Sequence, residues 1–229
     1  MMTATQAGQA QASRRGCFIT LEGVDGAGKS THVEWLAAQI RDAGHSVITT
    51  REPGGTPLGE VLRGVLLSHD MQADTEALLM FAARNEHLAL CIQPALARGQ
   101  WVVCDRFTDA SYAYQGGGRG LSQERLAILE QWVHAGLQPD CTFLFDLSPE
   151  LAHERLLRSR DRDRFEREEM VFFERTRAAY LARARAHPER FCILDSSLPM
   201  AYTRQRLLEH LQQLLGGFGA VDDDTGAVR

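Results

Sequence analysis

A glycine-rich loop near the N-terminus limits the folds open to this chain more than any other part of the sequence. It reads Gly23-Val24-Asp25-Gly26-Ala27-Gly28-Lys29-Ser30, which matches the phosphate-loop pattern G-x-x-x-x-G-K-[ST]. An apolar run at residues 17–22 precedes the loop, and apolar residues at helical spacing follow it between Val33 and Ile40. Because a phosphate loop joins a strand to a helix, this context argues against a chance match.

The loop predicts where the phosphates of a bound nucleotide lie. Its glycines let backbone N–H groups turn inward around phosphate oxygens, and the N-terminus of the following helix adds partial positive charge. Lys29 is expected to reach the terminal phosphates, and Ser30 is expected to ligate Mg²⁺. The residues expected to contact ATP are Gly23, Val24, Asp25, Gly26, Ala27, Gly28, Lys29, Ser30 and Thr31.

The rest of the chain alternates short apolar runs with longer segments of helical period, which is typical of a parallel sheet with crossover helices. The helix after the loop should end at Gly44, and a second helix should run from near Asp74 toward Pro94, which should kink or end it. Ser122 and Ser148 are predicted to open two further helices. Strands are predicted at residues 17–22, 47–50, 101–105, 141–146 and 191–195.

Composition excludes several classes of protein. The net charge of -5 argues against a protein that coats nucleic acid, which needs an excess of basic side chains. No apolar run approaches the roughly 18 residues of a membrane span, so a cytoplasmic enzyme is expected. The five cysteines form no CxxC pair, which predicts neither a zinc site nor a disulfide framework. Residues 1–15 are predicted to be a disordered extension, and residues 216–229 a flexible tail.

The strand at 101–105 ends in an acid followed by an arginine. Asp105, at the carboxyl end of a strand beside the loop, is expected to hold Mg²⁺ through water. Arg106 is expected to grip a second phosphate group, although a purely structural ion pair between the two is the alternative. A GTPase is excluded because guanine is read by an Asn-Lys pair, whereas the only asparagine is Asn85 and the only lysine is Lys29.

Several segments together resemble bacterial thymidylate kinase in their order and spacing, over roughly residues 17–215. Besides the loop they are Thr50-Arg51-Glu52-Pro53-Gly54-Gly55-Thr56, Phe81-Ala82-Ala83-Arg84, Asp105-Arg106-Phe107 and Tyr114-Gln115-Gly116-Gly117-Gly118-Arg119-Gly120. The resemblance implies an α/β fold of the P-loop nucleoside monophosphate kinase type, with three layers, a five-stranded parallel sheet and helices on both faces. It also implies one kinase domain at 16–215 with a small arginine-rich lid at about 155–168, a homodimer, and transfer of the γ-phosphoryl group of MgATP to dTMP.

The resemblance also implies roles for residues at matching positions. Asp25 would approach the sugar 3'-hydroxyl and the reacting phosphates, and Arg84 would address a base carbonyl. Ser111 and Gln115 would complete recognition of the thymine edge. The residues implied around the acceptor phosphate are Arg51, Arg63 and Arg106, those implied near the sugar are Tyr112 and Tyr114, and Glu52 and Pro53 complete the substrate site.

Two positions depart from the family pattern. The base-stacking aromatic residue of the family stands four residues before the helix arginine, where this chain has Met80. Phe81 is three residues before Arg84 and shares that helix face, so either side chain is a candidate to cover the base, with core packing as the alternative for Phe81.

The lid is the second departure, because the glycine-containing lid pattern that is usual in the family is altered in this sequence. Because Gly26 follows Asp25, the catalytic arginine is expected to come from the lid rather than from the loop. The candidates are Arg160, Arg162 and Arg164, which the sequence does not rank. Alternating charge in this stretch is also typical of a solvated helix face.

The expected mechanism is positioning combined with charge neutralisation. The acceptor oxygen of dTMP is already anionic near neutral pH, so no strong general base is needed. Lys29, Mg²⁺ and the lid arginines would offset charge on the γ-phosphoryl group, with Asp25 and Arg106 aligning the acceptor. Two alternatives stay open: a deoxynucleoside kinase or another nucleoside monophosphate kinase, with Glu22 or Asp25 available as a base in the former case, and a P-loop regulator that binds nucleotide without turnover.

Overall fold

A parallel five-stranded sheet organises the molecule. The computed structural model describes residues 15–157, 164–166 and 168–218, and within them the strand order is β2-β3-β1-β4-β5 with every neighbouring pair parallel. The strands are β1 (Phe18–Glu22), β2 (Val47–Arg51), β3 (Trp101–Asp105), β4 (Cys141–Asp146) and β5 (Phe191–Asp195). The prediction of a five-stranded parallel sheet is confirmed.

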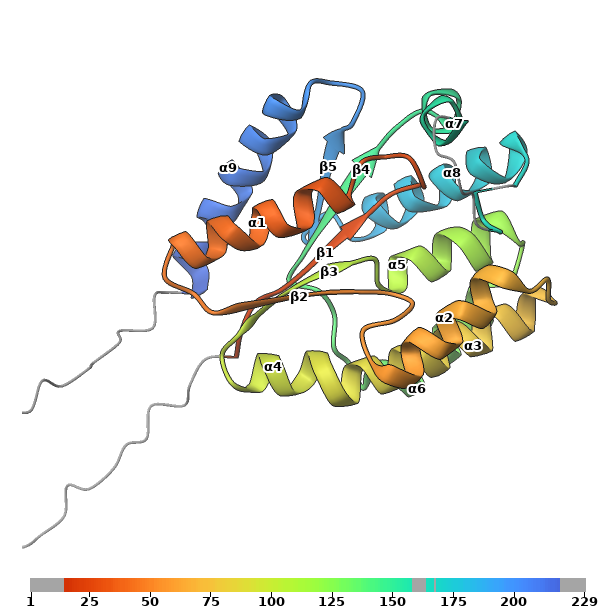
Figure 1. Cartoon of the computed structure of the whole chain (residues 1–229), viewed down its shortest axis with the longest axis horizontal. Coiled ribbons are helices and arrows are strands. Elements are labelled where there is room, and N and C mark those ends of the chain that lie inside the picture. Colours follow the sequence, from red (N-terminus) through yellow and green to blue (C-terminus); the bar gives the residue numbers. More distant parts are fainter. Residues whose placement is uncertain (1–14, 158–163, 167, 219–229) are drawn as a thin grey trace, which may run out of the picture.

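Helices cover both faces of this sheet, which makes the three layers visible in Figure 1. The helices are α1 (Ser30–Asp42), α2 (Pro57–Ser68), α3 (Ala73–His87), α4 (Gln93–Ala97), α5 (Thr108–Ser111), α6 (Gln123–His134), α7 (Pro149–Leu157), α8 (Met170–Ala186) and α9 (Met200–Phe218). Two π-helical segments, η1 (Leu88–Ile92) and η2 (Tyr112–Gly118), complete the set within the described residues.

The alternation of side chains along the strands supplies a core on each face. Ile19 and Val103 point into the cluster that α1 and α9 cover, whereas Phe18 and Val102 point into the cluster covered by η1 and α4. Both faces of a parallel sheet are therefore apolar, which explains why its strands read as nearly continuous apolar runs in the sequence.

Local signals set the ends of several helices as predicted. The Ser122 hydroxyl accepts a hydrogen bond from the backbone N–H of Arg125 and caps α6. Gly44 ends α1 with φ of 88°, a left-handed conformation that suits glycine. Thr56 caps α2 in the same way as Ser122 caps α6, by accepting from the N–H of Gly59, but this helix was absent from the prediction.

Two elements differ from the sequence prediction, and a third had no prediction. Pro94 was expected to kink or end the helix from Ala73: the helix does not end there, but passes through η1 before the proline and continues to Ala97. The π-helical turn offsets the missing N–H of Pro94, which then lies in the first turn of α4. The glycine-rich stretch Tyr112–Gly118 is helical, and α9 extends to Phe218, beyond the predicted boundary at 215.

Candidate active site

The phosphate loop lies at the carboxyl end of β1, between this strand and α1. The Lys29 ammonium group is buried and donates hydrogen bonds to the backbone carbonyls of Gly23 (2.9 Å) and Val24 (3.0 Å). Burial, followed by the nearby Arg106 guanidinium group, lowers the pKa of Lys29 to about 8. An ammonium group held in the loop in this way can exchange carbonyl contacts for the oxygens of an anion.

Gly23 is required by the close approach of the loop to the neighbouring strand. Its φ is 139°, and a Cβ atom at this position would lie 2.4 Å from the carbonyl oxygen of Phe145 in β4. That partner is backbone and cannot move aside, so a side chain here would displace the loop. The glycine spacing of the motif thus follows from packing as well as from phosphate binding.

Ser30 and Asp105 meet at the mouth of the loop. The Ser30 hydroxyl donates to Oδ2 of Asp105 (2.9 Å), which joins the first residue of α1 to the last residue of β3. Within the described part of the chain, Oδ1 of Asp105 is buried and has no hydrogen-bond partner. A hydroxyl oxygen and a carboxylate with a spare acceptor are oxygen ligands of the kind that Mg²⁺ takes beside bound phosphates.

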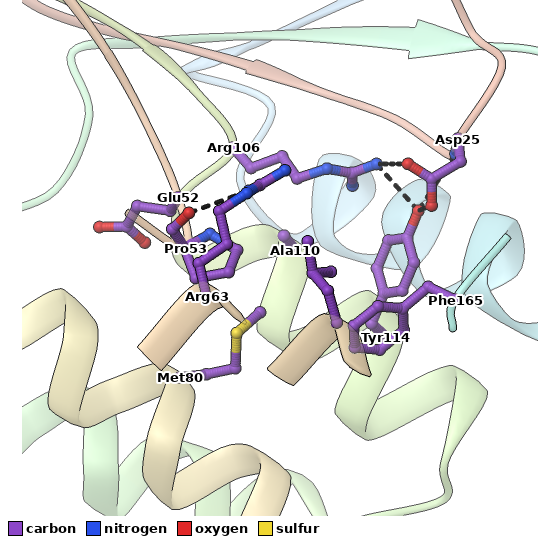
Figure 2. Close-up of a pocket in the computed structure, with 10 residues that line it drawn as sticks. Asp25, Glu52, Pro53, Arg63, Met80, Arg106, Ala110, Tyr114 and Phe165 are labelled. Atoms are coloured by element: carbon purple, nitrogen blue, oxygen red, sulfur yellow. Dashed lines mark hydrogen bonds and ion pairs between the residues drawn. The ribbon is translucent and has the colours of Figure 1, made fainter. Parts of the chain in front are cut away.

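Arg106 joins the loop to the deeper pocket. It follows β3 with φ of 71°, a left-handed conformation that is rare for arginine and turns its side chain across the carboxyl edge of the sheet. The Nη2 atom of Arg106 donates both to Oδ1 of Asp25 (2.6 Å) and to the Tyr114 hydroxyl (3.0 Å). Its Nη1 atom donates to the Tyr180 hydroxyl (3.0 Å). Figure 2 shows the guanidinium group reaching across the pocket to Asp25.

Asp25 is held in its ionised form by these contacts. The Tyr114 O–H donates to its Oδ2 (2.6 Å). Burial raises the pKa of Asp25, but the charges of Arg106 and Lys29 outweigh burial, so the pKa is lowered from its usual value. The carboxylate is therefore an acceptor at neutral pH, placed between the loop and the pocket.

Glu22, the last residue of β1, faces inward. Its two oxygens accept hydrogen bonds from the backbone N–H of Phe107 (2.6 Å) and from the Tyr180 hydroxyl (2.8 Å), and the residue is fully buried. Burial, followed by the charge of Asp109, raises the pKa of Glu22 to about 8. Because both oxygens are occupied by buried donors, Glu22 does not present a base to the pocket.

A pocket opens beside Asp25 and Arg106. Met80 of α3 and Tyr114 of η2 line it, together with a residue from the lid segment, Phe165, whose ring packs against that of Tyr114 with centroids 5.7 Å apart. The full lining is Asp25, Glu52, Pro53, Arg63, Leu67, Met80, Arg106, Ala110, Tyr114 and Phe165. Phe81 is absent from this lining and lies in the core with its ring 4.6 Å from the Arg84 guanidinium carbon.

Arg84 is almost completely buried on the same face of α3 as Met80. Its Nε donates to Oε2 of Glu52 (2.7 Å), and its Nη2 donates to the Phe107 carbonyl (3.1 Å) and to the Ser111 hydroxyl (3.0 Å). Among the described residues, Nη1 of Arg84 and Oε1 of Gln115 are buried and lack a hydrogen-bond partner. Arg84, Ser111 and Gln115 are not among the lining residues of the pocket, although Arg84 contacts the lining residue Glu52. One spare donor and one spare acceptor are therefore buried in this region, and they are the two groups needed to read a polar edge of a base.

A second cleft of about 550 Å³ lies between the phosphate loop and the end of β2. Ser30, Asp105 and Arg63 line it, and Arg63 also lines the pocket beside Met80. Arg63 donates to the carbonyl oxygen of Pro53 (2.9 Å), which follows a cis peptide bond from Glu52. Arg51 lines the same cleft and is half-exposed, paired with Glu60 at 2.9 Å.

A third hollow lies on the other side of the loop, lined by Gly28, Leu198 and Met200. Arg155 of α7 also lines it and donates to the carbonyl oxygens of Gly26 (3.3 Å) and Ser196 (2.9 Å). Leu198 and Met200 are exposed apolar side chains beside this cation. An apolar surface next to the loop, edged by an arginine, is suited to a flat heterocycle.

The structure separates some residues that the sequence analysis grouped together. Tyr112 does not line the pocket: its hydroxyl donates to Glu130 of α6 (2.5 Å), on the far side of η2 from Tyr114. Arg164 donates to the Leu66 carbonyl (3.1 Å) and to the buried Glu76 carboxylate, so it is held at α3 rather than at the phosphate loop. The other two lid candidates, Arg160 and Arg162, lie outside the described residues.

Sequence reasoning missed four residues of this region: Glu76, Arg155, Phe165 and Tyr180. Arg155 and Phe165 belong to the stretch predicted as a lid, but nothing in the charge pattern distinguished them from their neighbours. The acid at position 76, one turn before Met80, was a readable signal, because a charged residue on the buried face of a helix needs a partner. No signal in the sequence indicated that Tyr180 of α8 contacts Arg106.

Comparisons with known proteins agree with one another. A family model described as thymidylate kinase matches residues 21–207. The chain is similar to the thymidylate kinase of Bordetella petrii, 66% identical over 200 residues that span 87% of this chain and 97% of the relative. It is also similar to that of Cupriavidus metallidurans, 60% identical over 200 residues that span 87% of this chain and all of the relative.

The solved structures give the same result at the level of the fold. The crystal structure of thymidylate kinase from Ehrlichia chaffeensis matches with a TM-score of 0.70 and 30% sequence identity, over 87% of this chain and 98% of that chain.

Proposed function

Because this chain belongs to the thymidylate kinase family and transfers the γ-phosphoryl group of ATP to dTMP, giving dTDP, we propose roles for its individual residues in that reaction. Membership of this family excludes two of the alternatives considered from the sequence, namely a deoxynucleoside kinase and a regulator that binds nucleotide without turnover. The observation that carries the residue assignment is the bridge from Arg106 to Asp25 between the phosphate loop and the pocket lined by Met80.

In this proposal the acceptor dTMP lies in the pocket lined by Met80. Its phosphate lies beside Arg106 and Arg63, and the Asp25 carboxylate accepts from the sugar 3'-hydroxyl. Arginine suits such a phosphate site because its planar fork donates two parallel hydrogen bonds. Arg51, at the edge of the neighbouring cleft, joins Arg63 on the path between the two phosphates.

The base of dTMP is covered by Met80 rather than by Phe81, which is in the core. Methionine makes favourable contacts with aromatic rings and adapts to their shape. Nη1 of Arg84 donates to a thymine carbonyl, with Glu52 and Ser111 holding the guanidinium group in place. Tyr114 closes the sugar end of the pocket and, in that position, crowds a 2'-hydroxyl.

ATP binds on the other side of Asp25. Its phosphates take the place of the two loop carbonyls as partners of Lys29, and its adenine lies in the hollow beside Arg155 and Met200. The N-terminus of α1 contributes partial positive charge at the same point. Thr31, which lines this hollow, completes the contacts of the loop.

Mg²⁺ fits the geometry at Ser30 and Asp105. The spare buried oxygen of Asp105 and the Ser30 hydroxyl would be the oxygen ligands that this chain offers to the ion beside the phosphates of ATP. In the described residues no group of three or more His, Cys, Asp or Glu side chains could hold a metal ion, so the cation is expected to arrive with ATP. When bound, Mg²⁺ neutralises charge on the transferring phosphoryl group.

The mechanism then depends on alignment of two anions. The acceptor phosphate is already nucleophilic, so the chain need not remove a proton from it. Lys29 and Arg106 offset the repulsion between the two phosphates, and Phe165, in the described part of the lid segment, excludes water from the acceptor. Arg164 contributes by docking this segment on α3, while Arg160 and Arg162 remain the candidates for a direct contact with the transferring group.

The substitution Arg106→Gln tests the assignment. It removes the charge and the fork, and we expect kcat/KM for dTMP to fall by about 30-fold or more, since truncating one partner of a buried charge pair costs about 2–5 kcal/mol. The KM for ATP should change little. The matched control is Arg125→Gln, which removes an exposed arginine paired with Asp74 and should retain full activity. A value of kcat/KM for dTMP within threefold of wild type in the Arg106 variant would refute the assignment.

We further propose that the chain forms a homodimer and acts in the cytoplasm. The support for a dimer is the set of large apolar side chains exposed on α3 and α6, namely Leu78, Ile128 and Trp132. The support for the location is chemical, because the cysteines are unpaired in the described residues and ATP is at hand in that compartment. In the part of the chain that the structure describes, no helix is both long and apolar enough to cross a membrane.

A further inference from the structure

Glu76 is an acid in the interior of the molecule whose part in the proposed mechanism is, so far, only to hold Arg164. It lies on α3 one turn before Met80, and its side chain is fully buried. Its Oε1 accepts from Nε2 of Gln115 (2.7 Å), and its Oε2 faces Arg164 and Nε of Arg119 (3.4 Å). Two arginines and one amide thus converge on a single buried carboxylate.

This contact fixes which end of the Gln115 amide faces the carboxylate. A carboxylate held by two guanidinium groups is an acceptor at both oxygens and cannot donate. The amide must therefore turn its NH₂ group toward Glu76, which directs Oε1 away from it. That oxygen is buried and, within the described residues, has no partner. An orphaned buried acceptor of this kind is satisfied by a donor that arrives with a ligand.

The chemistry of pyrimidine bases gives this orientation a consequence. Thymine presents the N3–H donor beside the O4 acceptor, whereas cytosine presents an N3 acceptor beside a 4-amino donor. An acceptor from Gln115 and a donor from Nη1 of Arg84 match thymine and oppose cytosine at both positions. A mismatch of buried polar groups is the strongest basis for discrimination available to a binding site.

We propose that Glu76 is a positioning residue for base selection: by accepting from Nε2 it holds Gln115 as a hydrogen-bond acceptor, and so selects thymine over cytosine. The inference rests on the proposed placement of the base beside Gln115 and Arg84. Glu76 itself does not touch the substrate. Uracil presents the same N3–H and O4 as thymine, so Glu76 should not affect selection between dTMP and dUMP.

The substitution Glu76→Gln tests this proposal. An introduced amide can donate or accept, so the Gln115 amide is free to turn and offer a donor to cytosine. We expect the ratio of kcat/KM for dTMP to that for dCMP to fall at least tenfold. The ratio of dTMP to dUMP should stay within about twofold of wild type, whereas a variant that merely loosens the pocket would change all three substrates together. An unchanged ratio of dTMP to dCMP would overturn the proposal.

A double-substitution cycle shows whether Glu76 acts through Gln115. Gln115→Ala removes the amide, so adding Glu76→Gln to it should not lower the dTMP to dCMP ratio further. Equal and additive losses would overturn the proposal. The matched control is Glu168→Gln, which removes a carboxylate that pairs with Arg119 at 2.6 Å, and it should preserve the ratio.

Two further measurements keep the proposal testable if Glu76→Gln does not fold. Glu76→Asp retains a group that only accepts, so the dTMP to dCMP ratio should stay within about threefold of wild type even where turnover falls; a relaxed ratio would contradict the proposal. The wild-type protein should also bind dTMP at least 100-fold more tightly than its N3-methyl analogue. Equal binding of the two compounds would overturn the placement of the base beside Gln115. If the N3-methyl analogue binds weakly but Glu76→Gln leaves the dTMP to dCMP ratio unchanged, only the role of Glu76 is overturned.

Discussion

At the scale of single residues, the charges around the substrate pocket are set by groups behind its wall. Glu52 connects Arg84 to His87, because its Oε1 lies 3.0 Å from Nδ1 of His87 while its Oε2 accepts from Arg84. Burial works against a charged imidazole, but the hydrogen bonds to Cys91 and Glu52 outweigh it and raise the pKa of His87 to about 9. His87 is therefore protonated at neutral pH and supports the carboxylate that aligns Arg84.

This pairing predicts a loss of stability in alkaline solution. A raised folded-state pKa means that the stabilisation by His87 is complete below its unfolded value of 6.5 and disappears as the pH rises through about 9. The free energy of unfolding by urea should fall by roughly 2 kcal/mol more in wild type than in His87→Gln between pH 6.5 and 9.5. Cys91→Ser, which replaces one of the two groups that raise the pKa of His87 by a neutral hydroxyl, should reduce this loss without abolishing it. Parallel pH profiles for wild type and His87→Gln would contradict the ionisation assigned to His87.

At the scale of elements, the active site depends on how closely η2 and α8 pack. Gly117 has no side chain to separate them: a Cβ atom there would lie 2.6 Å from Cβ of Ala179 and 2.7 Å from the carbonyl oxygen of Arg175. This approach brings Tyr180 of α8 to Arg106 and fixes Tyr114 and Gln115 on η2. The glycines at the end of η2 thus allow the close packing of η2 against α8.

Gly117→Ala should therefore reduce both stability and activity. Overpacking of a tight helix contact costs about 1–3 kcal/mol, and a shift of η2 displaces Tyr114, so the KM for dTMP should rise. Gly64→Ala is the matched control, because Gly64 lies in α2 with open space around its Cβ position, and this change should stabilise the protein by up to about 1 kcal/mol. Thermal unfolding and dTMP kinetics of both variants check the prediction. Equal melting temperatures for the two variants would rule out the packing argument.

The sequence allowed the strands to be predicted better than the helices, for a physical reason. The strands at 101–105 and 141–146 have the observed bounds because both sheet faces are buried there and their residues are nearly all apolar. The strand at 191–195 also has the observed bounds, although it is an edge strand on which Ile193 is 49% exposed. The helices α2 and α8 were not predicted, although Thr56 and Pro57 are an ordinary cap and first turn. The two π-helical segments have no sequence period, since one extra residue per turn moves each side chain to a new face.

At the scale of the whole molecule, the sheet brings the parts of the site together and side-chain contacts decide their roles. The motifs predicted which residues would gather at the carboxyl ends of β1 and β3, because parallel strands all end at the same edge. They did not predict that Arg164 would be held by Glu76, because that contact joins segments far apart in the chain. Spacing in the sequence can name neighbours on one helix face, such as Met80 and Phe81, but it left the choice between them open, and only the structure places Met80 in the pocket lining and Phe81 in the core.

The proposed dimer also belongs to the scale of the whole molecule, because its surface combines residues of α3 and α6. Trp132 is 79% exposed and Ile128 is 64% exposed on the same face of α6, one helical turn apart, and Leu78 of α3 is 56% exposed. Exposed aromatic side chains of this size are typical centres of interfaces between proteins, where they contribute most of the binding energy. Because α3 and α6 also share the cluster of Ala77, Phe81 and Leu126, a second copy bound there would brace the helix that carries Met80 and Arg84.

Trp132→Glu should therefore convert a dimer into a monomer. A charge at the centre of an apolar interface must be desolvated, so the dissociation constant should rise by about 100-fold or more. Sedimentation velocity at micromolar concentration measures the change, and Val171→Glu, which places the same charge at an exposed apolar position of α8, should leave the dimer intact. If the braced helix matters, the monomer should also show a raised KM for dTMP but an unchanged KM for ATP. A wild-type monomer at these concentrations would refute the dimer, and a dimeric Trp132→Glu variant would refute the assignment of its surface.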